Sequence, residues 1–174
     1  MLFWIKYLKG LLQTLNDDVS PNEIAAGVVF GVMIGLIPKG NLLALSLSIL
    51  IMIFRVNAGM AGAAIVVFSI LGHLTDPFCE KFGFWLLSGV PLFKGFWTFL
   101  YNTPIIPFTS FNNTLVMGNF AVGLLLALPV FFGMRAFVVT YRTRYRERVM
   151  QWKIMKFLKI HEFFDLYHRW VQRP

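Results

Sequence analysis

The sequence predicts an all-α integral membrane protein, and three observations support this fold class. Hydrophobic residues make up 57% of the 174 residues and charged residues only 14%, whereas a soluble domain is typically about 25% charged. The apolar residues come in long runs without charge, as lipid-facing helices do. The excess of basic residues that gives the net charge of +8 lies mostly in the last third of the chain, which in a membrane protein indicates orientation. We expect a re-entrant or broken helical hairpin and two to four transmembrane helices, flanked by interfacial amphipathic helices.

The central element is a glycine-rich helical hairpin over residues 20–57. Its two apolar segments, residues 24–37 and 41–54, are each about 14 residues long, fewer than the roughly 20 that a helix needs to cross a bilayer. The break between them contains Pro38 and Gly40. We interpret the segments as two half-helices folded against each other within the membrane. The alternative is a pair of tilted full crossings.

The start and one face of the hairpin carry specific helix signals. Ser20 is a preferred N-cap, Pro21 fits the first helical position, and Glu23 can close a capping box. Capping of the helix start can therefore explain Glu23 without any role in function. Small residues on a helix face let another membrane helix approach closely. We predict helix packing through four glycines, Gly27, Gly31, Gly35 and Gly62.

Polar residues near the ends of the two half-helices are the candidate binding site. Ionisable groups at membrane depth are costly, so they usually pair or line a cavity. A lysine, an arginine and helix termini would suit a phosphate or carboxylate headgroup. The alternative is that Lys39 and Arg55 only mark the ends of the segments. The candidate substrate- or lipid-binding residues are Glu23, Lys39, Asn41, Arg55 and Asn57.

The chain after the hairpin predicts two further crossings. Residues 58–74 form the first, which His73, Thr75, Asp76 and Pro77 are expected to end. Residues 78–100 predict a broken, partly interfacial helical pair, interrupted at Pro91 and Lys94, and residues 102–114 a loop. Residues 115–134 form the second crossing, which Pro129 should kink and Arg135 should end.

The two ends of the chain predict its orientation. Residues 1–19 form an amphipathic helix with Lys6 and Lys9 on its polar face, which either lies in the interface or packs on the protein. Residues 20–140 form the membrane domain, and residues 141–174 a basic tail suited to anionic lipid. Basic ends place both termini in the cytoplasm, so the number of full crossings is even. We expect a multi-pass protein of the bacterial inner membrane.

Catalytic and metal-binding patterns do not occur in the sequence. His73, His161 and His168 lack zinc-site spacing, and no phosphate loop or dinucleotide fingerprint is found. We therefore expect no enzymatic activity, no metal and no cofactor. Asp76 with His73 and Glu80 forms an acidic cluster that could bind a cation or proton, although a helix-end cluster explains it as well. The lone Cys79 is expected to be a small buried hydrophobe, and the basic charge comes without a nucleic-acid recognition motif.

The hairpin motif resembles a known bacterial membrane family. The stretch S-P-N-E-I-A-A-G-V-V-F-G-V-M-I-G-L-I-P-K-G-N, followed by F-R-V-N, is similar to the family called domain of unknown function 2062. The resemblance covers roughly residues 18–140, and it departs at residues 72–77, where this chain has G-H-L-T-D-P instead of an Asn-Pro-Thr turn. The matching residues are Pro21, Ala25, Gly27, Gly31, Gly35, Pro38, Gly40, Arg55 and Asn57.

A subgroup of that family, with a motif like Asn112-Asn113-Thr114 here, looks associated with large AsmA-like envelope proteins. The resemblance implies a lipid-handling partner or membrane platform for such a protein, in contact with membrane lipid and without nucleic acid. A homo-oligomer is the other assembly expected. The alternative function is a standalone transporter or flippase for an anionic lipid or solute, using the hairpin.

Overall fold

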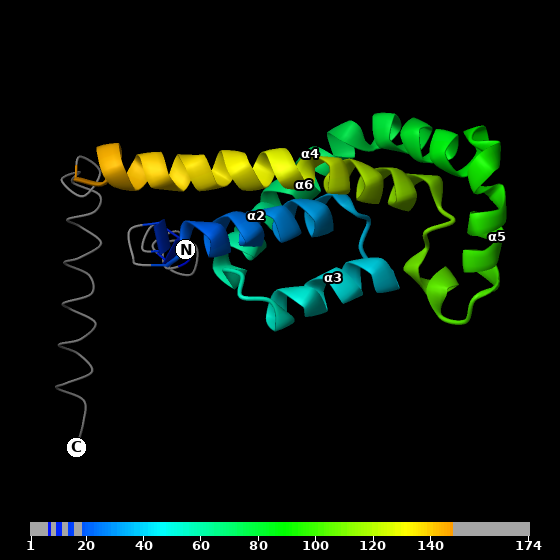
Figure 1. Ribbon diagram of the computed structural model, residues 1–174, viewed down its shortest axis with the longest axis horizontal. Coiled ribbons are helices and arrows are strands. Elements are labelled where there is room, and N and C mark those ends of the chain that lie inside the picture. The colour runs from blue at the N-terminus through cyan, green and yellow to red at the C-terminus, as the bar shows by residue number, and fades with distance from the viewer. Residues whose placement is uncertain (1–6, 8–9, 12–13, 16–18, 148–174) are drawn as a thin grey trace, which may run out of the picture. The chain divides into compact units, whose positions relative to one another are not determined.

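The computed structural model describes part of the chain, namely Tyr7, Gly10–Leu11, Thr14–Leu15 and residues 19–147. Two compact units divide the chain, residues 20–135 and residues 1–19 with 136–174. All regular elements of the described residues are helices, which confirms the predicted all-α class (Figure 1).

The larger unit begins with a helical hairpin and continues with two long helices. Ser20 accepts a hydrogen bond from the backbone N–H of Asn22 (3.3 Å), so the predicted helix start is confirmed. The predicted break is confirmed as well, because Gly40 adopts a φ of +93° that favours glycine. The elements in chain order are α2 (Pro21–Leu36), α3 (Leu42–Ile53), α4 (Ala58–Phe84), η1 (Trp85–Gly89), η2 (Pro91–Phe93), α5 (Lys94–Asn102), η3 (Ile106–Thr109) and α6 (Thr114–Thr140).

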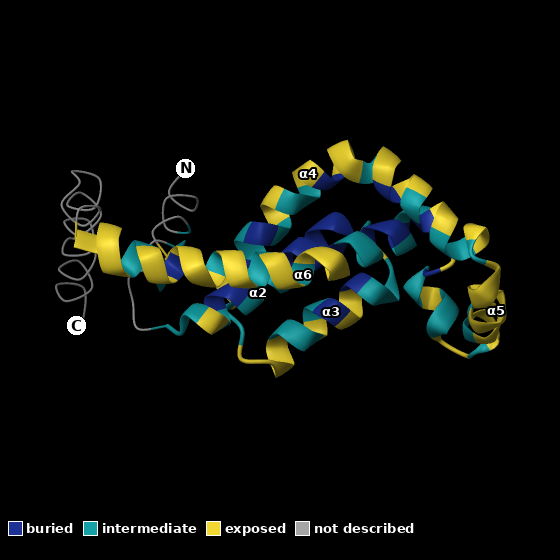
Figure 2. Ribbon diagram, turned by 45° about the horizontal axis from the view of Figure 1, so that its top comes forward, coloured by how far each residue is buried: buried dark blue, intermediate teal, exposed yellow. Residues whose placement is uncertain are grey.

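The predicted end of the helix of the first crossing, near Pro77, is wrong. α4 continues through Pro77 to Phe84 and is curved along its length (Figure 2). A proline inside a helix removes one backbone hydrogen bond, here the one to the carbonyl of His73, and favours bending. The adjacent carbonyl of Gly72 accepts a hydrogen bond from the Thr75 hydroxyl (3.1 Å). Asp76 is held from outside α4 by a hydrogen bond from Asn119 (3.1 Å).

The predicted broken pair over residues 78–100 has different boundaries in the structure. Its first part is the end of α4, followed by the π-helical turn η1. The break falls at Val90, whose backbone is extended, immediately before Pro91. Lys94 does not interrupt a helix but begins α5. The loop predicted over residues 102–114 contains only the short helix η3.

Glycines bring α2 directly against the backbone of α4. A Cβ at Gly27 would collide with the carbonyl oxygen of Asn57, and one at Gly31 would lie 2.5 Å from that of Ala61. The next contact along α2 is between Gly35 and Phe68, where the Cβ atoms would lie 2.7 Å apart. Because both residue numbers rise together, α2 and α4 run parallel. Gly62 is half-buried, and its predicted packing role stays a prediction.

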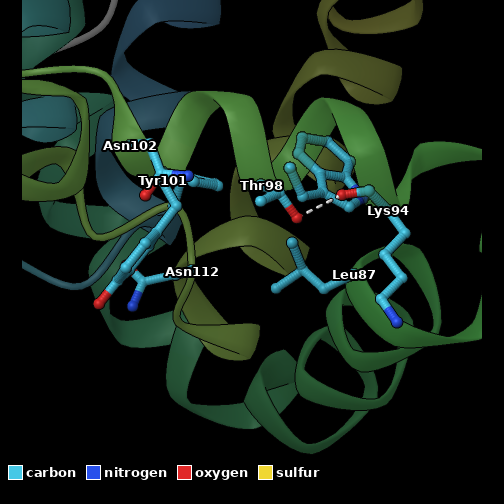
Figure 3. Close-up of a pocket in the computed structure, with 8 residues that line it drawn as sticks. Leu87, Lys94, Thr98, Tyr101, Asn102 and Asn112 are labelled. Atoms are coloured by element: carbon cyan, nitrogen blue, oxygen red, sulfur yellow. Dashed lines mark hydrogen bonds between the residues drawn. The ribbon is translucent and has the colours of Figure 1, made fainter.

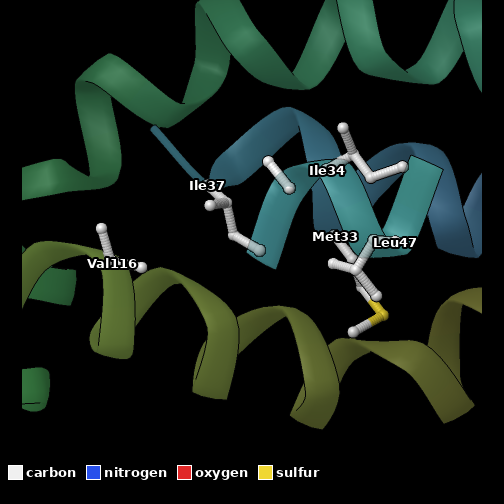
Figure 4. Close-up of a cluster of buried hydrophobic side chains, with 6 residues drawn as sticks. Met33, Ile34, Ile37, Leu47 and Val116 are labelled. Carbon is white, nitrogen blue, oxygen red and sulfur yellow. The ribbon is translucent and has the colours of Figure 1, made fainter. Parts of the chain in front are cut away.

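α6 runs antiparallel to α2 and α4. Near its start, a Cβ at Gly118 would collide with the carbonyl of Cys79, and a Cβ at Gly83 with that of Thr114. Further along, Gly123 lies against Met33 of α2 (3.4 Å from its Cα). The buried cluster where the hairpin meets α6 consists of Met33, Ile34, Ile37, Ala44, Leu47 and Val116 (Figure 4).

Apolar side chains remain exposed on most helices other than α2 (Figure 2). Two helical stretches, Ala58–Gly89 and Thr114–Tyr145, have the length and apolar composition of membrane spans. Only 22% of the most apolar window of each is buried. The core helix of a soluble protein would instead be mostly buried, since burial of apolar surface drives its folding.

In the smaller unit, hydrogen bonds from Arg142 join its two chain segments. Arg142 donates from its guanidinium to the carbonyls of Leu15 (2.9 Å) and Thr14 (3.3 Å). Such a cation is favourable beside helix carbonyls. The rest of the predicted basic tail, with His161 and His168, lies outside the described residues, as do Lys6 and Lys9.

Candidate functional site

Lys39, at the hairpin break, is bound to the carbonyl end of α2. Its ammonium donates three hydrogen bonds, to the carbonyl oxygens of Ile34 (2.8 Å), Gly35 (2.9 Å) and Ile37 (2.8 Å). A lysine has three N–H donors, so all of them are used within the hairpin. The positive charge also faces the negative end of the helix dipole. Lys39 therefore has a structural role that the sequence did not reveal.

Asn41 and Asn57 are the N-caps of the two helices that follow them. The side-chain Oδ1 of Asn41 accepts from the backbone N–H of Ala44 (2.8 Å), while its side-chain Nδ2 donates to the carbonyl of Pro38 (2.7 Å). The Asn57 side chain accepts from the backbone N–H of Met60 (2.8 Å). Asparagine immediately before an apolar helix is a preferred cap, so both residues could have been assigned from the sequence.

A cavity of about 430 Å³ lies beside the hairpin break, between α2, α4 and the start of α6. Lys39, His73 and Asp76 line it, and the three N–H donors of Lys39 are bound to carbonyl oxygens rather than to Asp76. The Nδ1–H of His73 donates to the carbonyl of Ser69 (2.7 Å), since a carbonyl can only accept. A neutral His73 therefore keeps Nε2 as an acceptor. Glu80, the third member of the predicted acidic cluster, is exposed and does not line this cavity.

Asn119 is the buried residue that holds Asp76 from the side of α6. It is 0% exposed, and its Nδ2 donates to Oδ1 of Asp76 (3.1 Å). Its own Oδ1 is buried and has no hydrogen-bond partner among the described residues. A buried unsatisfied amide oxygen is uncommon and costly. Asn119 is not among the predicted site residues, although a polar residue within an uncharged apolar span is a signal that could have identified it.

A second pocket, of about 400 Å³, lies where α2 begins and α3 ends. Glu23 and Arg55 both line it. The backbone N–H of Asn57 donates to the carbonyl of Glu23 (3.0 Å), which ties the segment after α3 to the start of α2. The aromatic residues in its wall are Phe30, Phe54 and Phe131.

A third pocket, of about 320 Å³, lies between η1, α5 and the following loop (Figure 3). Thr98 donates to the carbonyl of Lys94 within α5 (2.8 Å). The Lys94 side chain extends away from Tyr101 and Asn112 (Figure 3). The cationic group of this pocket is thus directed away from its polar side chains, and no concentrated polar site forms.

The five predicted site residues are divided between the two ends of α2. Lys39 and Asn41 lie at the break, and Glu23, Arg55 and Asn57 lie together at the start of α2. Because α2 has 16 residues, the two groups are about 24 Å apart. They form two sites rather than one. In the part of the chain that the structure describes, no group of three His, Cys, Asp or Glu side chains is arranged to hold a metal.

Comparisons with known proteins give one distant similarity. The chain is 27% identical over 139 residues to an uncharacterized protein of Treponema pallidum (strain Nichols), a match that spans 80% of this chain and 85% of that protein. No protein-family profile matches the chain, and no solved structure matches it. The similarity therefore indicates no activity for this chain.

Proposed function

We propose that this chain is a non-enzymatic protein of the bacterial inner membrane that handles lipid and serves as the membrane platform of a larger envelope protein. The observation that carries the proposal is the exposure of its two long apolar helices. In each helix, only 22% of the most apolar window is buried. In water these surfaces would be unfavourable, because burying apolar area is worth about 25 cal/mol per Å². Lipid tails or the apolar helices of a partner would cover them.

The short helices of the hairpin support a re-entrant topology within that proposal. α2 has 16 residues and α3 has 12, which correspond to about 24 and 18 Å. Both are shorter than the roughly 30 Å hydrocarbon core. With α2 entering beside α4, the tip at Lys39 ends inside the membrane. There the ammonium of Lys39 caps the carbonyl oxygens of Ile34, Gly35 and Ile37. Lys39 and Gly40 are exposed, so at membrane depth a water-filled cavity or a partner protein has to cover the tip.

In the proposed orientation, both termini and the Glu23 end of α2 lie at the cytoplasmic face. α4 leaves the cytoplasm and the antiparallel α6 returns to it, which makes two full crossings. Arg55 and Arg135 then lie on the cytoplasmic side, as the excess of positive charge there favours. α5 and its aromatic residues lie at the opposite interface, where aromatic side chains are favoured.

The partner proposed is a large AsmA-like envelope protein with a membrane anchor, and the resemblance of the hairpin motif to domain of unknown function 2062 supports this choice. Exposed apolar side chains of α3, including Met52 (86% exposed) and Ile53 (68% exposed), offer a contact surface for such an anchor. Purification of the full chain in mild detergent is expected to bring down one large single-span protein. Recovery of a solitary homo-oligomer instead would contradict the platform function.

Cysteine accessibility tests the re-entrant tip separately. In a Cys79→Ala background, Lys39→Cys is compared with Asn112→Cys, which lies in an exposed loop before α6. An impermeant maleimide added from the periplasm is expected to label position 112 and to leave position 39 unmodified. Equal labelling of the two positions would rule out a buried tip.

A standalone transporter is the second candidate function, and the cavity between Lys39 and Asp76 favours it. Opposite charges that line one cavity beside a buried amide commonly mark ion or substrate pathways at membrane depth. In proteoliposomes, Asp76→Asn, Lys39→Ala and Arg55→Ala would then abolish movement of an anionic lipid without lowering protein abundance. If these variants only lower abundance, the residues are structural and this second function is excluded.

A further inference from the structure

The pocket at the start of α2 holds one negative and one positive side chain, and neither is an N-cap. Ser20 caps α2, and Asn57 caps α4. Glu23 lies in the first turn of α2, where its negative charge interacts favourably with the helix dipole. No ion pair joins Glu23 to Arg55, and neither side chain forms a hydrogen bond with the described residues. The backbone hydrogen bond from Asn57 to the Glu23 carbonyl (3.0 Å) nevertheless fixes the two segments beside each other. The pocket of about 400 Å³ is thus a fixed site with two separate charges.

Aromatic rings form the apolar wall of the same pocket. Phe30 and Phe54 stack with their ring centroids 6.1 Å apart, and Phe131 contributes from α6. Glu23 and all three rings are at least partly exposed, as is Arg55. A ligand that fits must therefore carry a cation, an anion and an apolar chain.

We propose that this pocket binds a zwitterionic phospholipid with a primary ammonium group, such as phosphatidylethanolamine. The Arg55 guanidinium contacts the phosphate, whose geometry matches the planar fork of an arginine. The Glu23 carboxylate accepts from the ammonium, and an acyl chain leaves along Phe30, Phe54 and Phe131. An anionic phospholipid without an ammonium group would bring its negative charge near the Glu23 carboxylate without offering it a donor. The pocket is therefore expected to prefer a headgroup that carries an ammonium.

The other end of the hairpin does not compete for this ligand. All three N–H donors of Lys39 are bound to carbonyls of α2 and the residues just after it, which leaves no donor for a phosphate. The Glu23–Arg55 pocket also lies at the ends of α2 and α3, where the proposed topology puts the cytoplasmic headgroup region. The inference rests on the proposed function, because phospholipid reaches this pocket only in a membrane protein.

Lipid titration of the delipidated full chain in detergent tests the site. Phosphatidylethanolamine and phosphatidylglycerol with identical acyl chains are added separately, and bound lipid is counted by native mass spectrometry. One phosphatidylethanolamine is expected to bind at least about tenfold more tightly than phosphatidylglycerol, as expected for one charge-assisted hydrogen bond. Glu23→Gln should remove this preference, whereas Arg55→Gln should weaken binding of both lipids.

Control substitutions outside the pocket and charge-conserving substitutions inside it separate loss of the site from loss of the fold. Glu80→Gln and Arg135→Gln remove exposed charges outside the pocket, and both should bind like the unchanged chain. If a glutamine variant does not fold, Glu23→Asp and Arg55→Lys replace it and should show intermediate weakening. These two variants keep each charge but change its reach or its fork geometry.

The inference and the proposed function fail in different ways. Equal binding of the two lipids by the unchanged chain, or an unchanged preference in Glu23→Gln, overturns the headgroup site while leaving insertion and partner capture untouched. Glu23→Gln and Arg55→Gln could instead lose equal thermal stability without any change in lipid binding. That result would show that Glu23 and Arg55 pair with each other, and it would overturn the headgroup site as well. A chain that alkaline carbonate extracts from membranes overturns the proposed function itself.

Discussion

Substituting Gly31 by alanine tests the close contact on which the hairpin depends. A Cβ at Gly31 would lie 2.5 Å from the carbonyl oxygen of Ala61 and 2.5 Å from Cβ of Ala64, whereas ordinary contact begins at 3.4 Å. The shortfall of about 0.9 Å cannot be relieved by side-chain rotation, because one neighbour is backbone and the other is a Cβ. α2 must therefore move away from α4. Overpacking of this kind typically costs about 1–3 kcal/mol.

A value near 2 kcal/mol corresponds to a roughly 30-fold shift of the unfolding equilibrium. We expect to measure it as a lower denaturant midpoint during unfolding of the purified protein in mixed micelles. Gly133→Ala is the matched control, since a Cβ there meets nothing within 4 Å. Replacing a helical glycine without strain should stabilise by about 0.5–1 kcal/mol. Ala64→Gly added to Gly31→Ala should restore only part of the loss, because the Ala61 contact remains. Equal stability of the Gly31 and Gly133 variants would refute the packing argument.

Three further substitutions follow from hydrogen bonds of the hairpin and of α6, and unfolding in mixed micelles measures each of them. Lys39→Met should destabilise by about 1–3 kcal/mol, because it leaves helix carbonyls unpaired; an unchanged midpoint would show that Lys39 does not cap α2. Asn57→Ala should cost about 1 kcal/mol through loss of an N-cap, and Asn57→Asp should retain most of the stability; equal losses would contradict the cap. Asn119→Ala should lower stability by about 1–3 kcal/mol, because Asp76 loses its buried partner. In an Asp76→Asn background the same change should cost clearly less, and strict additivity would show that the two side chains are not coupled.

The sequence predicted the parts of the fold that depend on local pattern. Ser20 and Pro21 start α2 as expected, and Pro38 with Gly40 separates the half-helices, since capping and breaking act through neighbouring backbone. The helix of the first predicted crossing does not end at Pro77, because proline inside a helix does not by itself stop it. α4 continues through Pro77 and packs against α6, where Asp76 accepts a hydrogen bond from a residue 43 positions away in the sequence.

The candidate site was only partly predictable, because some of its contacts are long-range. Charged side chains are costly to place in a membrane, so Glu23, Lys39 and Arg55 are unusual within an apolar chain. Whether each side chain finds a partner is decided by the fold. Lys39 satisfies the end of its own helix, whereas Glu23 and Arg55 line one pocket and have no hydrogen-bond partner among the described residues.

The sequence by itself determined the helical class, the division of the hairpin and the apolar composition of the long helices, because these follow from periodicity, glycine and proline positions and hydropathy. Only the tertiary structure decided that α2 and α4 run parallel in backbone contact. It also paired Asp76 with Asn119, and it placed the candidate residues at two sites about 24 Å apart. The physical reason is that long-range contacts depend on which helix faces meet, and local pattern does not specify that.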